Sequence, residues 1–214
     1  MGGITYPQIL FILQGAGWTL VLSLLGFVGG TLIGLPAAIA RTSKNTPLRI
    51  AVAAYINVVQ GIPLPIIMFL AYFGISVAGF NVPALVAAGI AMTAYSSAFL
   101  AEIWRGSIES VPRAQWEAAE CLALTDMQRL THVILPQAVR ISIPPTIGFL
   151  VQIIKNTSYA VVIGFADLTY SARLINNTTF QPFTVFSIAA LLYFAICFPL
   201  SRFSKTLERK LNRS

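Results

Sequence analysis

The sequence predicts an all-α membrane protein with five transmembrane helices, its N-terminus outside and its C-terminus in the cytoplasm. Hydrophobic residues make up 57% of the chain and charged residues only 10%, and the mean hydropathy is +0.78, far from the values of soluble domains. The apolar residues form long continuous runs, whereas a membrane β-barrel shows alternating segments of about ten residues. Lys and Arg collect in alternate connections between these runs.

Five segments are long enough to cross about 30 Å of hydrocarbon, which takes roughly 20 mostly apolar residues. They run approximately from Ala16 to Ala40, Leu48 to Ile75, Pro83 to Ile103, Pro144 to Gly164 and Phe183 to Phe203. We therefore expect a single transmembrane domain over residues 1–214, with residues 104–143 as a cytoplasmic loop within it.

The first span holds Gly30 and Gly34 about one helical turn apart. Small residues at this spacing let two helices approach closely in a membrane, although a glycine-rich helix also produces the pair by chance. Trp18, near the outer end, fits the belt of aromatic side chains at the membrane surface. This helix is expected to pack closely against a neighbour.

The second span is interrupted in its middle by the sequence QGIPLP at residues 60–65. Pro63 and Pro65 cannot donate to a helix ladder, and lipid cannot satisfy the carbonyl groups that they free. Such a break is tolerated only where protein or water faces it. The sequence therefore predicts a broken helix beside a polar region, with Gln60 as a candidate lining residue.

The third span carries hydroxyl groups at Tyr95, Ser96 and Ser97. In a membrane helix such groups more often hold helices together than contact a ligand, so each alone predicts little. At the inner end, Glu102 and Arg105 are three residues apart and are expected to pair along the helix face. That pair has a structural rather than a catalytic pattern.

The loop at residues 104–143 is too polar for lipid and is expected to fold in the cytoplasm. It contains arginines and the acidic residues Glu109, Glu117, Glu120 and Asp126. Residues 115–123 are rich in helix formers, and Thr125 with Gln128 matches a capping box that would start a second short helix. Pro136 is expected to end that helix, because proline cannot continue the hydrogen-bond ladder.

The fourth span places a charge, Lys155, near the middle of the membrane, where it costs on the order of several kcal/mol unless it is paired or hydrated. Two interpretations stay open: the lysine neutralises or reaches the surface while its hydroxyl neighbours bond to their own helix, or these groups line a hydrophilic cavity. Polar residues of three spans share a similar depth, which favours a cavity. The candidate lining residues are Gln60, Ser96, Ser97, Lys155, Asn156, Thr157 and Ser158.

Basic residues indicate the orientation of the chain. Lys and Arg lie between the first two spans, between the third and fourth, and after the fifth, whereas the opposite side has only Arg173. Since cytoplasmic loops carry the excess of Lys and Arg, the N-terminus is expected outside. The net charge of +7 therefore indicates topology before it indicates nucleic-acid binding.

The sequence lacks the usual patterns of catalytic and metal sites. His132 is the only histidine and has no neighbouring Cys or His, so no metal site is expected. There is no G-x-x-x-x-G-K-S/T phosphate loop. We therefore do not expect this chain to be an enzyme, and if ATP drives it, another chain hydrolyses the ATP.

The sequence EAAECLALTDMQRLTHVILP, from Glu117 to Pro136, resembles the EAA loop of permease subunits in ABC importers. That motif reads EAA, three residues, Gly, nine residues, Ile, one residue, Leu-Pro. Ala123 stands in the place of the glycine and Val133 in the place of the isoleucine, and the other positions match. Because the glycine permits a tight turn, Ala123 is expected either to keep a negative φ or to be strained.

Three further stretches are similar to the polar amino-acid permeases, the histidine, glutamine, glutamate and arginine type. They are AEIWRGSIESVPRAQWEAA at 101–119, QGIPLPIIMFLAYFG at 60–74 and KNTSYAVVIG at 155–164. Ala114 replaces a usual glycine, and Asn156 stands where these permeases commonly have an acidic residue. The resemblance extends from the second span to the fourth, and the fifth matches in position and basic tail.

The resemblance implies a type I ABC importer permease fold in the bacterial cytoplasmic (inner) membrane. A second permease subunit, identical or related, an ATPase pair and an extracytoplasmic amino-acid-binding protein would be its partners. ATP and Mg²⁺ would bind to the ATPase, and this chain would hold no cofactor. The residues expected to couple to the ATPase are Glu117, Ala118, Ala119, Ala123, Thr125, Asp126, Met127, Gln128, Arg129 and Leu130.

Two other functions are compatible with a membrane protein of this composition. A channel or secondary transporter works without ATP, so binding of an ATPase to residues 117–136 distinguishes it from an importer. An intramembrane enzyme is disfavoured, because no paired carboxylates, metal ligands or activated nucleophile occur at membrane depth. Five spans line only one side of a pathway, which favours pairing of two permease chains.

Overall fold

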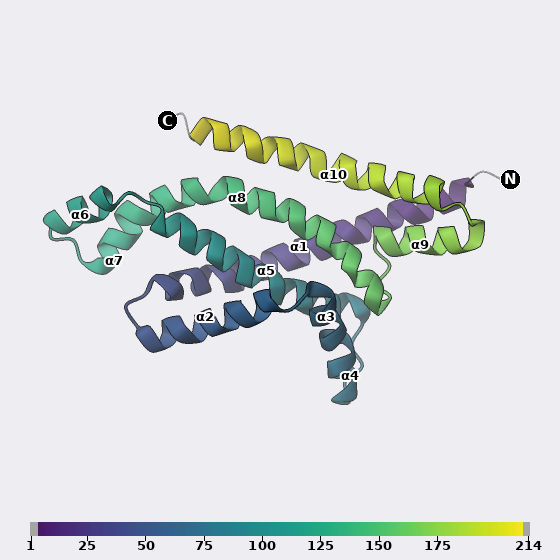
Figure 1. Cartoon of the computed structure of the whole chain (residues 1–214), viewed down its shortest axis with the longest axis horizontal. Helices are drawn as coiled ribbons and strands as arrows, with labels where there is room; N and C mark the ends of the chain where they lie inside the picture. Colours follow the sequence, from purple (N-terminus) through teal and green to yellow (C-terminus); the bar gives the residue numbers. More distant parts are fainter. Residues whose placement is uncertain (1–3, 212–214) are drawn as a thin grey trace.

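The computed structural model describes residues 4–211, which form helices joined by short connections and contain no strand (Figure 1). The α-helices are α1 (Tyr6–Thr42), α2 (Thr46–Gly61), α3 (Leu64–Phe69), α4 (Ile75–Val77), α5 (Ala84–Glu109), α6 (Arg113–Cys121), α7 (Asp126–Gln128), α8 (Leu135–Asn156), α9 (Leu168–Thr179) and α10 (Pro182–Leu211). Two π-helical stretches, η1 (Leu70–Gly74) and η2 (Arg129–Ile134), and a 3₁₀ stretch, η3 (Thr157–Ile163), lie between them.

Four helical segments are long and apolar enough to cross a membrane, and a bent pair supplies a fifth span when it is counted as one. The four are Tyr6–Thr42, Ala84–Glu109, Asp126–Ile163 and Pro182–Leu211, and the pair is Thr46–Gly61 with Leu64–Val77. The predicted all-α fold with five spans is therefore confirmed. The helices run beyond the apolar segments that predict them, because backbone hydrogen bonding continues into their polar ends.

Close contact between α1 and α5 forms the centre of the molecule. A Cβ added at Gly30 would lie 2.5 Å from the Cβ of Ser96, and one at Gly34 would lie 2.9 Å from the carbonyl oxygen of Ser97. No side chain larger than hydrogen fits at either position without a shift of α5. The expectation that this glycine pair marks a helix contact is confirmed.

The predicted break in the second span lies between α2 and α3, whose directions differ by 100°. Pro63 is the N-cap of α3 and Pro65 lies in its first turn, where a missing N–H leaves no helix bond unmade. The segment from α3 to α4 turns away from α2 (Figure 1).

The capping box at the start of α7 is confirmed. The backbone amide of Gln128 donates to the Thr125 hydroxyl at 3.3 Å, and the backbone amide of Thr125 donates to the Gln128 side chain at 3.0 Å. Two amides that the helix cannot satisfy internally thus have partners.

The expectation that Pro136 ends this helix is wrong. The π-helical stretch η2 leads directly into α8, where Pro136 lies in the first turn, and the helix continues to Asn156. Proline lacks an N–H and crowds the carbonyl of the preceding turn. A π turn locally widens the hydrogen-bond ladder, so the chain accommodates the proline there without stopping.

The two ends of the molecule differ in charge. Figure 1 shows α6, α7, the α1–α2 connection and the last turns of α10 at one end, and α9 with the first turns of α1 at the other. The basic residues of the connections are therefore gathered at the end that holds α6 and α7, the arrangement on which the expected orientation depends.

Candidate functional site

Asn156 is a buried polar residue at the end of α8. Its side chain is 3% exposed, and its Oδ1 accepts a 2.9 Å hydrogen bond from the Gln152 amide. Its Nδ2 has no hydrogen-bond partner among residues 4–211. Leaving a buried donor unpaired costs about 1–3 kcal/mol. Tyr95 of α5 interacts with this amide without meeting the full geometry of a hydrogen bond, so the donor is only weakly satisfied within the chain.

Aromatic rings lie beside this amide. Phe149 stacks on Phe99 with ring centroids 5.5 Å apart, and Tyr95 lies 4.5 Å from Phe99 and 6.2 Å from Phe149. The region thus combines apolar walls with a few polar atoms, the composition of small-molecule sites. The structure brings together Tyr95, Gln152 and Asn156.

Ser96 lies elsewhere, against Gly30 in the α1–α5 contact. It is 0% exposed, and its hydroxyl has no partner within the described part of the chain. The helix contact with α1, and not the region around Asn156, surrounds this side chain.

Gln60 and Ser97 connect α2 to α5. The Ser97 hydroxyl lies 2.7 Å from the hydroxyl of Tyr55, and the Gln60 side chain donates to the carbonyl of Ala98 at 3.4 Å. Both predicted lining residues therefore make hydrogen bonds between helices at the break of the second span. Tyr55, which the sequence analysis did not single out, completes this connection.

The hydroxyls after Lys155 bond to their own helix. The Thr157 hydroxyl, fully buried, donates to the Ile154 carbonyl at 2.9 Å, and the Ser158 hydroxyl donates to the Lys155 carbonyl at 2.7 Å. Lys155 itself is exposed and forms no ion pair among residues 4–211. The two hydroxyls thus have hydrogen-bond partners in their own helix. The Lys155 ammonium group and the Asn156 amide still have N–H donors that make no full hydrogen bond within the described chain.

One face of α8 is an exposed stripe. It contains Pro145, Gly148, Gln152 and Lys155, and this spacing of three and four residues places them on one side of the helix. Polar side chains and a charge at membrane depth are unstable against lipid. The stripe therefore requires protein or water against it.

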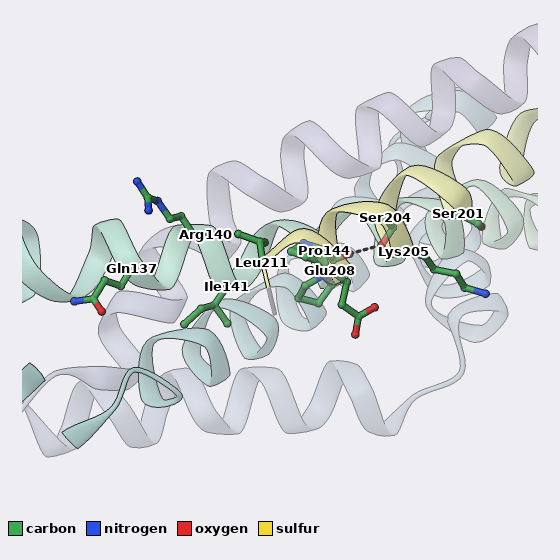
Figure 2. Close-up of a pocket in the computed structure, with 11 residues that line it drawn as sticks. Gln137, Arg140, Ile141, Pro144, Ser201, Ser204, Lys205, Glu208 and Leu211 are labelled. Atoms are coloured by element: carbon green, nitrogen blue, oxygen red, sulfur yellow. Dashed lines mark hydrogen bonds between the residues drawn. The ribbon is translucent and has the colours of Figure 1, made fainter. Parts of the chain in front are cut away.

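A cavity of about 760 Å³ lies at the basic end of this stripe, between α8 and α10. The Ser204 hydroxyl of α10 donates to the Pro144 carbonyl of α8 at 2.8 Å and holds the two helices together there (Figure 2). Figure 2 also shows Arg140 and Lys205 pointing away from each other. Because these cations do not converge, the cavity has the form of an open groove and not of an anion site.

The loop between α5 and α8 folds on an apolar core of its own, formed by Ile108, Val111, Ile134 and Ala138. Between α6 and α7, Ala123 adopts a φ of +53°, so of the two alternatives left open by the sequence, a negative φ or strain, the structure has the second. A left-handed conformation costs a residue with a Cβ roughly 1–2 kcal/mol. The loop is therefore a folded unit with a strained tip.

Two large apolar side chains project at this tip. Leu122 is 73% exposed and Met127 is 68% exposed, on either side of the strained turn. Apolar side chains that a fold leaves in water beside polar neighbours are typical of a protein contact surface.

Ion pairs tie the tip to the spanning helices. Arg129 pairs with Asp126 and, at 3.2 Å, with Glu120, while Asp126 also pairs with Lys44 of the α1–α2 connection. Such exposed pairs each contribute about 0–1 kcal/mol. Their effect is to fix the position of α7 relative to α1 and α2.

The predicted pair of Glu102 and Arg105 is confirmed, with nitrogen–oxygen distances of 2.6 and 2.9 Å. Arg41 of α1 joins the same carboxylate at 3.4 Å. The pair thus links α5 to the end of α1.

Asp167 is a buried acidic residue that the sequence analysis missed. It is 0% exposed, lies in the connection between η3 and α9, and accepts hydrogen bonds from the Tyr170 amide at 2.9 Å and the Tyr193 hydroxyl at 3.3 Å. Burial raises the pKa of the Asp167 carboxyl above its usual range. An Asp directly before Leu-Thr-Tyr at a helix start is an N-cap pattern that could have been found in the sequence.

A family model described as "binding-protein-dependent transport system inner membrane component" matches residues 30–213. Curated proteins are similar over nearly the whole chain. "Probable amino-acid ABC transporter permease protein YckA" of Bacillus subtilis is 38% identical over 94% of this chain and 88% of its own length. "Glutamine transport system permease protein GlnP" of Escherichia coli is 34% identical over 96% of this chain and 95% of its own length.

Solved structures share the fold. A chain of the structure titled "Crystal structure of an amino acid ABC transporter with histidines" superposes with a TM-score of 0.89, at 32% identity, over 98% of this chain and 100% of that one. A chain of the inward-facing MetNI methionine ABC transporter superposes with a TM-score of 0.80, at 19% identity, over 97% of this chain and 99% of that one. The second likeness concerns the fold alone.

Proposed function

The chain belongs to the family of inner membrane components of binding-protein-dependent transport systems, and from this premise we propose that it forms half of the translocation path of an amino-acid ABC importer. It is a multi-pass permease subunit of the bacterial cytoplasmic membrane. Amino acids are the substrate class, since the relatives at 34–38% identity are named as amino-acid and glutamine permeases.

The observation that carries this function is the open polar face of α8. Gln152 and Lys155 present an exposed amide and a cation at membrane depth, and the buried amide of Asn156 lies directly behind them, joined to Gln152 by a hydrogen bond. A second permease subunit, identical or related, supplies the opposite wall. Together the two walls enclose a hydrated path, which removes the cost of exposing these groups to lipid.

An amino acid offers the groups that this face lacks. Its carboxylate is complementary to the Lys155 ammonium, and either its carboxylate or a side-chain carbonyl accepts a hydrogen bond from the Asn156 amide. Tyr95 stands beside this amide on the path. Gln60, Ser97, Thr157 and Ser158 shape the wall through the hydrogen bonds that they make within the chain, and Ser96 does so through the α1–α5 contact.

The loop at residues 104–143 transmits the work of a separate ATPase. Its exposed tip, with Leu122 and Met127, docks on the ATPase, and the ion pairs of Asp126 carry a displacement of α7 to α1 and α2. ATP binding draws the two ATPase subunits together and with them the two loops. The permease subunits then rock between inward-open and outward-open states, and hydrolysis resets them.

ATP and Mg²⁺ belong to the ATPase and not to this chain. Within residues 4–211, no group of three or more His, Cys, Asp or Glu side chains is placed to hold a metal ion.

An extracytoplasmic binding protein delivers the amino acid at the α9 end, opposite the basic end. We propose accordingly that the N-terminus lies outside and that residues 1–214 act as one permease domain.

Cysteine crosslinking at the tip tests this account. Because Cys121 is an exposed thiol at the same tip, both variants carry Cys121→Ser. We expect a Gln128→Cys variant in this background, in membranes that contain the whole transporter, to form a crosslink with the ATPase subunit whose yield changes when ATP is bound. The matched control is Ser76→Cys in the same background, at an exposed position of α4, which should give no ATPase adduct. Equal yields at the two positions would contradict the assignment of the loop.

A further inference from the structure

Three adjoining cavities run along α1, α2 and α5, and none of their lining residues belongs to the exposed stripe of α8. The first lies at the basic end of the molecule and has a volume of about 320 Å³. The second, of about 480 Å³, and the third, of about 900 Å³, follow toward the other end. The second and third share lining residues, and the first lies next to the second at the end of α1 and the start of α2.

The first cavity is basic. Arg41, Arg49 and Arg105 line it from three different segments, together with Thr42, Trp116 and the Glu109 carboxylate. Arg105 is paired with Glu102 and Glu109, and Arg41 makes a single 3.4 Å contact with Glu102. Arg49 is exposed and has no ion pair within residues 4–211. Three guanidinium groups thus face two carboxylates, and Arg49 is the group with its charge uncompensated.

The second cavity begins where the first ends. Ala40 and Leu48 line it, and they are the chain neighbours of Arg41 and Arg49. Ala37, Ala51 and Val52 continue its wall between α1 and α2. Its lining is apolar apart from the hydroxyl of Tyr55.

The third cavity shares Ile33 and Tyr55 with the second, so the groove continues along the membrane-spanning part of α1. Its other lining residues are mostly leucine, valine, isoleucine and alanine from α1 and α5. An arginine cluster at one end of the spans is thus followed by a long apolar groove that runs into the membrane.

We propose that this groove binds a phospholipid with an anionic headgroup. The phosphate lies among Arg41, Arg49 and Arg105, and one acyl chain follows the second cavity between α1 and α2 and the third between α1 and α5. Guanidinium groups match phosphate oxygens in geometry and charge, and basic pockets between membrane helices on the cytoplasmic side are suited to anionic headgroups. A free phosphate would use only the first cavity, whereas a phospholipid uses all three.

The proposed lipid site is lined by residues from two parts of the chain that the proposed transport cycle uses. Trp116 belongs to α6 of the loop, and Arg105 belongs to the ion-pair cluster that joins α5 to α1. A bound lipid therefore touches both the ATPase-docking loop and the spanning helices. The inference rests on the proposed function only in taking the basic end as the cytoplasmic one.

Photolabelling tests the proposal on the full chain in nanodiscs of phosphatidylcholine. The probe is a small fraction of phosphatidylglycerol with a photoreactive group on its acyl chain, and mass spectrometry locates the labelled peptides. We expect labelling to concentrate on residues 24–55 and 85–94, which line the two apolar cavities. Arg49→Gln should lower it about fivefold, the effect expected from the loss of one arginine near an anionic lipid. Ala51→Trp should lower it by filling the groove while leaving every arginine in place.

The matched control is Arg209→Gln, which removes an equal charge from an exposed site at the same end of the molecule and should leave labelling unchanged. Saturating inorganic phosphate should lower labelling only partly, because it competes for the arginines but not for the apolar cavities that hold the acyl chain. Equal labelling of wild type and Arg49→Gln, complete loss of labelling with free phosphate, or crosslinks from the groove to another protein chain would each overturn the proposal.

The labelling needs neither ATPase nor amino acid, so it separates the two proposals. A chain that binds the lipid but supports no uptake contradicts the transport function alone. A complex that transports an amino acid but labels uniformly contradicts the lipid site alone.

Discussion

Ala123, Asn156 and Asp167 each carry a local cost in this fold: one adopts a left-handed backbone, one keeps an unpaired buried N–H, and one buries a carboxyl group. Residues that store such costs cluster where a protein moves or binds. Ala123 lies at the tip for which we propose ATPase docking, Asn156 lies beside the proposed path, and Asp167 lies in the connection between η3 and α9.

Replacing Ala123 with glycine should stabilise the chain. Relief of the left-handed strain of about 1–2 kcal/mol exceeds the entropy cost of glycine, about 0.5–1 kcal/mol, so a gain of up to about 1 kcal/mol is expected. Thermal unfolding of the purified chain in detergent measures it. The matched control, Ala118→Gly in the middle of α6, should instead lose about 1 kcal/mol. A loss at both positions would contradict the argument from strain.

Asn156→Ala should reduce amino-acid uptake by about tenfold, the value of one hydrogen bond of roughly 1.4 kcal/mol to the passing substrate. Asn156→Asp should shift uptake toward cationic amino acids, since it adds a carboxylate to the path. Uptake of radiolabelled amino acids into cells measures both. Ser76→Ala, which removes a hydroxyl that bonds to its own helix, should change nothing.

Asp167 gives a dependence of stability on pH. Burial raises the pKa of its carboxyl in the folded chain, so the folded state holds the carboxyl proton more tightly than the unfolded state does. The stabilisation that this proton gives to the fold is fully present below the ordinary pKa of 3.8. It is lost as the pH rises through the raised pKa. Asp167→Asn keeps an oxygen acceptor for the Tyr170 amide and removes the ionisation. Its melting temperature should exceed that of wild type at pH 7, by a margin that narrows as the pH falls. A margin independent of pH would contradict this explanation.

At the scale of the elements, α1 and α5 depend on glycine for their contact. Gly30→Val should destabilise the chain by several kcal/mol, because its Cβ would meet the Cβ of Ser96 at 2.5 Å and overpacking of a helix contact costs about 1–3 kcal/mol or more. Gly17→Val is the matched control, since nothing lies within 4 Å of its added Cβ. Thermal unfolding of the two variants, compared with wild type, measures the difference.

Most elements could be predicted because the residues that start, break or cap them lie close together in the sequence. Proline placement revealed the break of the second span, and the spacing of Thr125 and Gln128 revealed the start of α7. Pro136 was misjudged because the π-helical η2 depends on how the loop packs on Ile108 and Val111, residues more than twenty positions earlier. Proline alone does not show whether the preceding turn has widened.

The candidate site was only partly predictable. The depth of Lys155 and Asn156 followed from the length of the fourth span. Whether a hydroxyl faces the path or its own helix depends on rotamers and neighbours, so Ser96 and Thr157 could not be distinguished from true lining residues. Tyr55 was overlooked because its partner Ser97 lies on another helix. Gln152 lies four residues before Asn156 on the same helix, so that spacing could have revealed it.

For the whole molecule, the exposed polar stripe of α8 supports the proposal that this chain forms one half of a transport path. A path needs a second wall, a docking tip needs a partner, and the charged groups of the stripe need water. These needs agree with an importer assembled from two permease subunits, two ATPase subunits and a binding protein.

Uptake of an amino acid into proteoliposomes tests the central claim most directly. Liposomes would hold this chain with its permease partner and ATPase, ATP inside, and the binding protein loaded with a radiolabelled amino acid outside. We expect accumulation against the gradient that stops when ATP or the binding protein is omitted. Equilibration of the amino acid without ATP and without the binding protein would contradict the account and identify an autonomous channel or carrier.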